Sequence, residues 1–166
     1  MAKGIFQRHT KGLVAYGGQP LIGDMLWIDP ITNITYCYDV VRTKWLSAEK
    51  PVFEYARKGA AKGVYLPLLG DLDDTDDVYM PNRPSTVLGI FCRSKSGDAY
   101  TEFALKKNTA TIYTFSYNGN ADRTFLINDL NLNIEPTDKI QVYVSKSSSA
   151  IINTVCRVET AWRYDI

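Results

Sequence analysis

The strongest constraint on the fold of this 166-residue chain is a strict alternation of apolar and polar side chains near its C-terminal end. Leu130, Leu132 and Ile134 are separated by single polar residues, which is the pattern of a strand with one face in a core. The turn at 135–138 is followed by a second alternating segment over residues 140–145. Because a helix needs an apolar period near 3.6, this part of the chain is predicted to consist of strands.

The same alternation continues through residues 85–166, where it predicts about seven strands and no helix. The candidate strands cover residues 87–92, 103–106, 112–117, 124–127, 130–134, 140–145 and 152–164. In the last of them, every second residue from Ile152 to Tyr164 is expected on one face. Short strands at this spacing are typical of antiparallel sandwiches. We therefore predict an all-β fold, an antiparallel jelly-roll-like β-sandwich with a small N-terminal β-hairpin segment.

The first 70 residues carry too few strands to build a core of their own. Residues 25–39 predict a hairpin, and residues 44–46 are a candidate third strand. Residues 51–58 are interpreted as two helical turns and residues 59–63 as a linker. A ribbon of two or three strands is marginally stable alone. We therefore expect residues 1–70 to be an attachment segment that packs on another subunit or on a larger particle.

An acidic run at residues 71–77 separates this segment from the predicted sandwich domain at 85–166. Residues 1–70 carry nine Lys and Arg against five Asp and Glu, whereas residues 71–84 carry one against five. We compared the run with an EF-hand calcium loop that starts at Asp71. It has Asp76 where the loop needs its turn glycine and Asn82 where the loop needs its bidentate glutamate. We therefore interpret residues 71–84 as a hydrated, proline-containing linker, with weak calcium binding by the Asp71–Asp77 loop as the alternative.

The residue groupings of common catalytic and cofactor sites are not found in this sequence. His9 is the single histidine and lies in a polar stretch, so neither a Ser-His-Asp device nor a histidine metal site is expected. Cys37, Cys92 and Cys156 are far apart and lie in apolar runs, which is typical of small buried hydrophobes in a reducing compartment. No glycine-rich phosphate loop occurs. We therefore predict a non-enzymatic protein that has no metal and no cofactor.

Charge and hydropathy also argue against two classes of partner. The formal net charge is +1 at pH 7, which provides no electrostatic reason to expect nucleic-acid binding. Residues 1–13 contain no apolar run, and no later segment approaches the roughly 18 apolar residues of a spanning helix. Neither a nucleic acid nor a membrane is therefore expected as a partner.

Four aromatic side chains in the predicted hairpin are the candidate site residues: Trp27, Tyr36, Tyr38 and Trp45. Aromatic residues are enriched at interfaces between proteins, and they also stack on sugar rings or pair across neighbouring strands. We favour their burial in a subunit or particle interface. Packing within one chain and contact with a glycan are the alternatives that this pattern leaves open.

The hairpin residues resemble a short module of bacteriophage fibre and appendage proteins. In that module a GDLWID start, a Y-x-YD strand and a closing KW recur. Here residues 23–29 read GDMLWID, residues 36–39 read YCYD, and Lys44 precedes Trp45. The resemblance implies an N-terminal segment that attaches the chain to a virion.

The C-terminal strands resemble the β-sandwich heads of phage head-fibre and decoration proteins, which are distant relatives of the C1q and tumour-necrosis-factor jelly rolls. The similarity is carried by residues 114–119 (TFSYNG), 130–134, 138–144 and 158–163. In the usual sandwich pattern Gly-Asp precedes the strand at Ile140, whereas Thr-Asp stands there in this chain.

This resemblance implies a homotrimer without catalytic residues, located in the virion and assembled in the host cytoplasm. Within that class we favour a capsid head fibre or decoration protein of a tailed phage, which the N-terminal segment anchors on the major capsid protein. A tail-fibre or receptor-binding tip protein is one alternative. The other is a carbohydrate-binding β-sandwich module that uses the aromatic hairpin to contact host-surface glycans.

Overall fold

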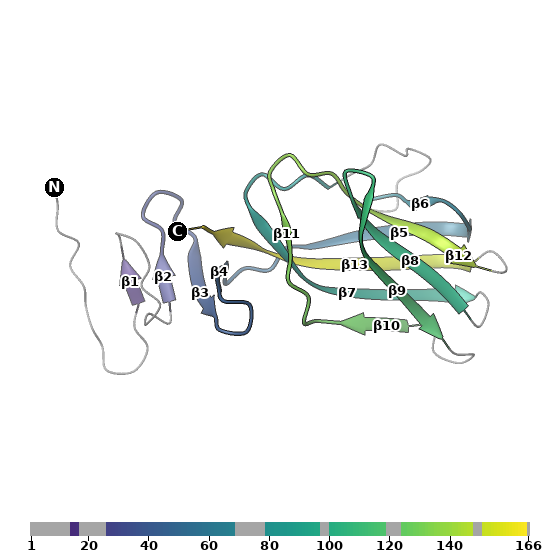
Figure 1. Cartoon of the computed structure of the whole chain (residues 1–166), viewed down its shortest axis with the longest axis horizontal. Helices are drawn as coiled ribbons and strands as arrows, with labels where there is room; N and C mark the ends of the chain where they lie inside the picture. Colours follow the sequence, from purple (N-terminus) through teal and green to yellow (C-terminus); the bar gives the residue numbers. More distant parts are fainter. Residues whose placement is uncertain are drawn as a thin grey trace.

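The computed structural model describes residues 14–16, 26–68, 79–96, 100–118, 124–147 and 151–165, which form thirteen strands (Figure 1). The strands are β1 (Val14–Tyr16), β2 (Leu26–Ile28), β3 (Thr35–Asp39), β4 (Lys44–Ser47), β5 (Val52–Ala61), β6 (Tyr65–Leu66), β7 (Ser85–Ser96), β8 (Tyr100–Lys107), β9 (Ala110–Asn118), β10 (Thr124–Ile127), β11 (Leu132–Ile134), β12 (Ile140–Ser147) and β13 (Ile151–Tyr164). No helix occurs in these parts of the chain. The predicted all-β fold is confirmed, and the seven strands expected over residues 85–166 correspond to β7–β13.

The strands form two sheets that face each other. One sheet has nine strands in the order β1-β2-β3-β4-β13-β7-β10, with β5 also paired to β13 and β11 also paired to β7. The other has four strands in the order β6-β12-β8-β9. Apart from β1 and β2, which are parallel, the paired strands are antiparallel. In Figure 1, β8 and β9 cross in front of β13 and β7, an arrangement consistent with a β-sandwich.

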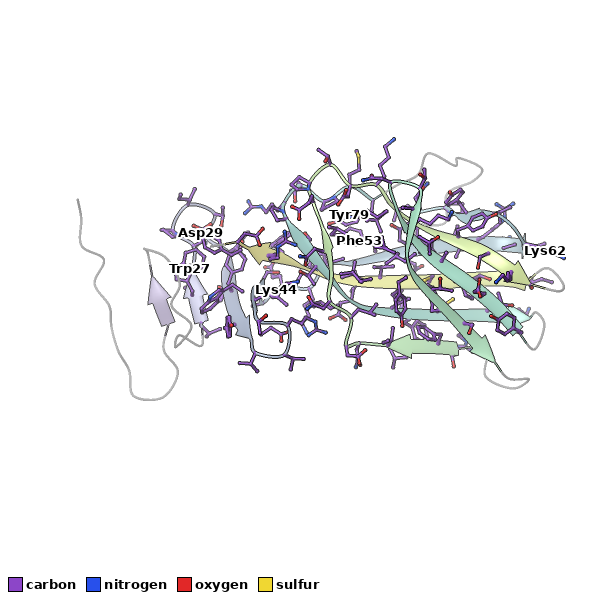
Figure 2. All side chains as sticks on the ribbon, in the orientation of Figure 1. Trp27, Asp29, Lys44, Phe53, Lys62 and Tyr79 are labelled. Carbon is purple, nitrogen blue, oxygen red and sulfur yellow. The ribbon has the colours of Figure 1, made fainter. Side chains whose placement is uncertain are left out.

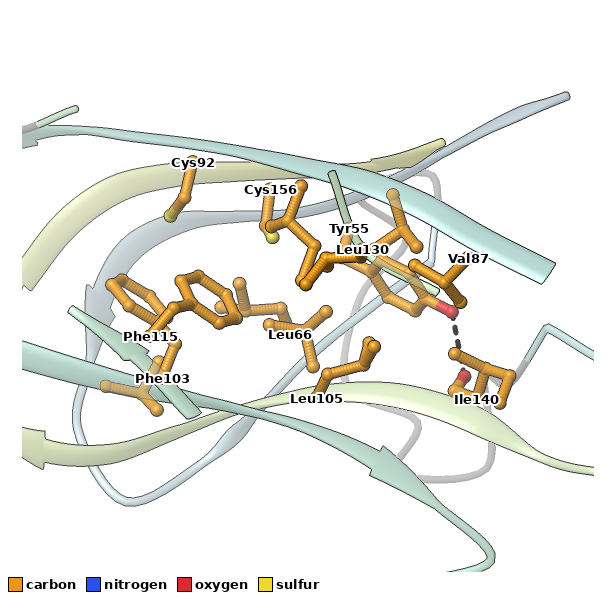
Figure 3. Packing of buried hydrophobic residues seen from close by; sticks show 14 of the residues in the cluster. Tyr55, Leu66, Val87, Cys92, Phe103, Leu105, Phe115, Leu130, Ile140 and Cys156 are labelled. Atoms are coloured by element: carbon orange, nitrogen blue, oxygen red, sulfur yellow. Dashed lines mark hydrogen bonds between the residues drawn. The ribbon is translucent and has the colours of Figure 1, made fainter. Parts of the chain in front are cut away.

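The core between the sheets consists of the inward-facing side chains of both layers (Figure 3). Phe103 and Phe115 lie opposite each other on β8 and β9, with ring centroids 5.2 Å apart. The hydroxyl group of the buried Tyr55 donates a hydrogen bond to the Ile140 carbonyl oxygen at 2.8 Å, so its polar atom is satisfied. Full burial of one large apolar side chain contributes about 1.5–3 kcal/mol. This gain explains why the alternation seen in the sequence determines the fold.

The last strand, β13, joins the hairpin strands to the sandwich. Over most of its 14 residues it lies between β5 and β7, while Arg163 and Tyr164 at its end pair with Leu46 and Trp45 of β4. A β-bulge places one extra residue, Leu88, on β7 opposite the step from residue 159 to 160. Beyond the bulge both faces of β13 are covered, so the predicted one-face alternation ends there.

The predicted domain boundary at residue 70 is wrong, because β5 and β6 belong to the sandwich. β5 pairs with β13, and β6 pairs with β12. Tyr55 of β5 and Leu66 of β6 are both buried in the core. The prediction of two helical turns at residues 51–58 is also wrong, because this segment gains more by burying Phe53 and Tyr55 as alternate residues of a strand.

The predicted linker at residues 59–63 is the end of β5 and the turn into β6. Gly59 has a φ of 88°, and its N–H group donates to Asn153 Oδ1 at 2.8 Å. Gly63 has a φ of 62°, and its N–H group donates to the Val144 carbonyl at 3.1 Å. Gly59 therefore permits a left-handed backbone within β5, and Gly63 permits one in the turn from β5 to β6. They do not separate two domains.

Two predictions fall wholly or partly outside the described residues. His9 and the acidic run at 71–77 lie there, so the expectations about histidine chemistry and calcium stay predictions. Only residues 79–84 of the expected linker at 71–84 are described. Tyr79 exchanges backbone hydrogen bonds of 3.2 and 2.8 Å with Ile140, which holds this end of the segment against β12.

Candidate functional site

The four predicted site residues lie on one face of the sheet formed by β2, β3 and β4. Trp27 is directly opposite Tyr36, and Tyr38 is directly opposite Trp45. The ring centroids of these pairs are 5.5 and 5.4 Å apart. Since alternate residues of a strand share a face, the sequence brings all four rings together once the hairpin forms.

The end of β13 covers this aromatic face. Tyr164 lies with its ring centroid 4.5 Å from that of Trp27 and 5.8 Å from that of Tyr36, and Trp162 packs beside it. Trp27 and Trp45 are each only 1% exposed, and Figure 2 shows Trp27 within the hairpin end of the molecule. We define the aromatic cluster as Trp27, Tyr36, Tyr38, Trp45, Trp162 and Tyr164.

The expectation that Trp27, Tyr36 and Trp45 are exposed until another subunit covers them is therefore wrong. Their side chains are buried within a single chain, which was the intramolecular alternative. The physical reason is the length of β13, which extends past the sandwich and supplies the missing cover. Tyr38 alone of the four is half-buried, so it is the one that a partner can still reach.

Asp29 directly follows β2 and Asp39 ends β3, and each aspartate builds the turn that follows its strand. Asp29 Oδ1 accepts a hydrogen bond from the Ile31 N–H group at 3.0 Å, and its Oδ2 accepts one from the Thr32 hydroxyl group. Asp39 Oδ1 accepts from the N–H groups of Val41 and Arg42 at 3.0 and 2.9 Å. The WID and YD sequences therefore encode turn geometry as well as aromatic packing.

Arg42 and Lys44 fasten the hairpin to the sandwich. The Arg42 guanidinium donates from Nε to the Leu130 carbonyl at 2.6 Å and from Nη2 to the Asn128 carbonyl at 2.9 Å. Figure 2 shows Lys44 between the hairpin and the sandwich, and its Nζ donates to the side chains of Asn131 and Asn133. Both cations reach the segment that joins β10 to β11.

The surroundings of Asp39 and Lys44 shift the pKa of both groups. Partial burial alone acts to raise the pKa of Asp39, but the hydrogen bonds and charge of Arg42, with the Val41 N–H group, lower it below the ordinary value. The pKa of Lys44 is lowered by burial and then by repulsion from Arg163. At neutral pH Asp39 is thus held as a carboxylate at the junction.

A shallow apolar groove lies on the outer face of the sheet formed by β5, β13, β7 and β10. It has a volume of about 580 Å³ and is lined by Val52, Gly89, Ile90, Phe91, Leu126, Ile127, Asn128, Arg157 and Glu159. Phe91 is paired with Leu126 on one side and with Arg157 on the other. Leu126 is 70% exposed and Val52 is 53% exposed, so two large apolar side chains face solvent here.

A second, more polar groove of about 620 Å³ continues this surface toward the hairpin. It is lined by Cys37, Tyr38, Asp39, Arg42, Leu46, Ser47, Ala48, Lys50, Leu88, Asn128 and Glu159. The two grooves meet at Asn128 and Glu159, which line both. We call the combined surface the outer groove. Among the predicted site residues, Tyr38 is the one that borders it.

The charges along the outer groove are balanced. Arg157 Nε pairs with Glu54 Oε2 at 2.8 Å, and Lys50 Nζ lies 3.6 Å from Glu159 Oε1. An apolar floor with a polar rim is the composition of a protein–protein interface. Balanced ion pairs at the rim contribute little to affinity but favour one orientation of a partner. The outer groove is therefore suited to contact between proteins.

Sequence reasoning did not identify the outer groove. A signal was present in β7, where Ile90 and Cys92 face the core and Phe91 must then face outward. An outward phenylalanine between two inward apolar residues indicates a strand that is covered on both faces. Leu126 and Val52 could not be assigned to the groove from the sequence, because they reach it only through the pairing of strands that are distant in the chain.

Two further observations bear on function. In the described ranges, no group of three or more His, Cys, Asp and Glu side chains is placed to hold a metal ion. No helix long and apolar enough to cross a membrane occurs in the same ranges. No known protein family matches the sequence, and no curated protein matches it either.

Proposed function

We propose that the protein is a non-enzymatic structural component of a tailed-bacteriophage virion, a capsid head fibre or decoration protein with a jelly-roll-like head. The proposal rests on the resemblance of two sequence segments to such proteins, and one structural observation supports it. The single strand β13 is shared by the hairpin and the sandwich, so both form one continuous sheet. A rigid connection of this kind suits a protein that holds a head domain at a fixed position.

The two ends of the molecule have different roles in this proposal. Strands β1, β2 and β3 lie at one end of the long axis, and the sandwich extends to the other end (Figure 1). In the sequence, residues 1–70 carry an excess of basic residues, among them Lys3, Arg8 and Lys11. We assign the hairpin end to attachment on the major capsid protein and the sandwich to the exposed head.

The outer groove is the proposed contact between subunits of a homotrimer. Its floor includes the exposed Leu126 and Val52 and the partly buried Phe91, which lose contact with water when a second subunit packs on them. Burial of apolar area contributes about 25 cal/mol per Å². The balanced charges at its rim allow copies with the same charge distribution to approach without net repulsion.

Glycan binding by the hairpin is less well supported. A sugar platform needs aromatic faces that are open to solvent, whereas Trp27, Tyr36 and Trp45 are buried. A tail-fibre or receptor-binding tip protein would use the same two ends, and its location on the particle distinguishes it from a head fibre.

The test combines particle binding with electron microscopy. Purified protein is mixed with bare capsids of the phage that encodes it, and bound copies are located by image reconstruction. We expect trimers on the capsid surface with the hairpin end proximal. A variant lacking residues 1–12 is expected to bind more weakly, since it loses the basic residues. Density on the tail alone, or no binding to any virion part, would contradict the proposal.

A further inference from the structure

Cys92 of β7 and Cys156 of β13 lie directly opposite each other in the core (Figure 3). Both side chains are fully buried, and both thiols are free. Two cysteines that were far apart in the sequence are therefore adjacent in the fold, and neither takes part in the proposed subunit or particle contacts.

The register of β13 shows which kind of cross-strand position this pair occupies. The Thr160 N–H group donates to the Pro51 carbonyl at 2.9 Å, on the β5 side of β13. Backbone groups of alternate residues point to the same neighbouring strand, so those of Cys156 also point to β5. The extra residue at the nearby bulge is on β7, so it does not change this alternation along β13. Cys156 therefore faces Cys92 at a non-hydrogen-bonded position.

Such positions have the right spacing for a covalent bridge. The Cα atoms of a non-hydrogen-bonded antiparallel pair are about 4.5 Å apart. Disulfides span Cα distances of about 4.4–6.8 Å. The strands therefore need no large displacement for the two sulfur atoms to bond.

We propose that Cys92 and Cys156 form a modification site for a low-molecular-weight disulfide oxidant such as oxidised glutathione, which converts them to a core disulfide between β7 and β13. The thiolate of one cysteine attacks the oxidant and releases one small thiol, leaving a mixed disulfide. The second cysteine then attacks the protein-bound sulfur and releases the other small thiol. Two electrons and two protons pass from the cysteine pair to the oxidant.

Access to the pair is controlled by opening of the sheet. Burial, and then the contact with Cys92, raises the pKa of Cys156, so the reactive thiolate is disfavoured in the closed core. The reaction takes place when β7 and β13 separate transiently or before they pair during folding. The site is therefore inert in the folded reduced protein and reactive in the opening or folding chain.

The disulfide would connect the two strands that hold the molecule together. β13 pairs with β4 of the hairpin and with β7 of the sandwich, and β7 is its partner strand within residues 85–166. A bridge between them closes a long loop of chain, which restricts the unfolded state. Oxidation thus makes the folded form more resistant to unfolding than the reduced form.

The experiment is refolding of the full chain with oxidised and reduced glutathione, in parallel with refolding in a strong reductant. Free thiols are then blocked by alkylation, and disulfide-linked peptides are mapped by mass spectrometry. We expect a Cys92–Cys156 link with Cys37 alkylated, and a higher melting temperature than for the reduced protein. The same mapping on folded protein is expected to show slow linking that denaturant accelerates.

Two variants control the assignment. Cys37→Ser changes the cysteine on the hairpin and is expected to leave the link and the gain in melting temperature intact. Cys92→Ala is expected to abolish both. If Cys92→Ala folds poorly, the disulfide-linked peptides mapped in the wild-type protein decide the proposal. A link that involves Cys37, two alkylated core cysteines, or a separate glutathione on each of them would overturn it.

Discussion

Tyr164 closes over Trp27 with ring centroids 4.5 Å apart, so the end of the last strand completes the core of the first described hairpin. In this cluster, the side chains from outside the hairpin that pack on its aromatic residues are Trp162 and Tyr164, which both belong to β13. Its stability therefore depends on β13, and the stability of the whole chain should respond to changes in the aromatic cluster.

Replacing Trp45 by alanine tests this dependence. Trp45 is buried, and removal of a buried tryptophan side chain costs about 3–5 kcal/mol. We expect a loss of that size in the free energy of unfolding, measured by urea denaturation. Val41→Ala is the matched control on the same hairpin, because Val41 is 81% exposed and its change should stay within about 0.5 kcal/mol. Equal effects of the two changes would contradict the assigned cluster.

Fragments test the revised domain boundary. The sequence analysis assigned the sandwich domain to residues 85–166, which implies that this part has a core of its own. The structure leads us to expect otherwise, because a fragment that starts at Pro84 lacks the core residues Tyr55 and Leu66. We expect it to be unfolded or molten by near-ultraviolet circular dichroism, whereas a fragment that starts at Lys50 retains cooperative unfolding. A cooperative transition in the shorter fragment would restore the original boundary.

Asp39 should make the stability of the junction depend on pH. Its folded-state pKa is lower than its ordinary value of about 3.9, so the carboxylate contributes stability above that value. The contribution is lost as the pH falls through the folded-state pKa. We expect Asp39→Asn to be less stable than wild type by about 1 kcal/mol at neutral pH. The difference should shrink toward zero in acid.

The matched control for this titration is again Val41→Ala, which changes no ionisable group. Its small difference from wild type should be the same at neutral and acidic pH. A difference between Asp39→Asn and wild type that stays constant down to strong acid would show that the charge of Asp39 is not what stabilises the turn.

The outer groove can be tested by introducing a charge. Leu126→Lys places a cation on the apolar floor, and burying an unpaired charge is costly. We expect the variant to be a monomer by light scattering at micromolar concentration, and the wild type to be a trimer under the same conditions. Ile31→Lys is the matched control, since Ile31 is 91% exposed on the hairpin turn and does not line the groove. If Leu126→Lys formed a trimer of unchanged stability, the contact between subunits would lie outside the outer groove.

The sequence predicted β9 and β11 from a simple alternation in which one face meets the core. The free energy of burial decides their pairing. β5 was misinterpreted because Glu54, Ala56 and Arg57 are good helix formers. Tertiary packing of Phe53 and Tyr55 overrides that local preference.

The aromatic cluster was predicted only in part, because some of its contacts come from strands that are distant in the sequence. The sequence identified Trp27, Tyr36, Tyr38 and Trp45 as a group, because their spacing places them on one face of a hairpin. It did not identify Tyr164 as their cover, since the pairing of β4 with β13 joins distant parts of the chain. The outer groove depends in the same way on the bulge at Leu88 and on the pairing of β10 with β7.

The continuity of β13 has a mechanical consequence. Hydrogen bonds between antiparallel strands are perpendicular to the strand axis. A tensile load applied between the hairpin end and the far end of the sandwich runs along β13, so it loads these bonds in shear and all of them share it. Strands pulled apart from one end would instead release their bonds one after another. The molecule is therefore built to resist traction along its length, and it should yield far more easily to a force that peels β13 sideways.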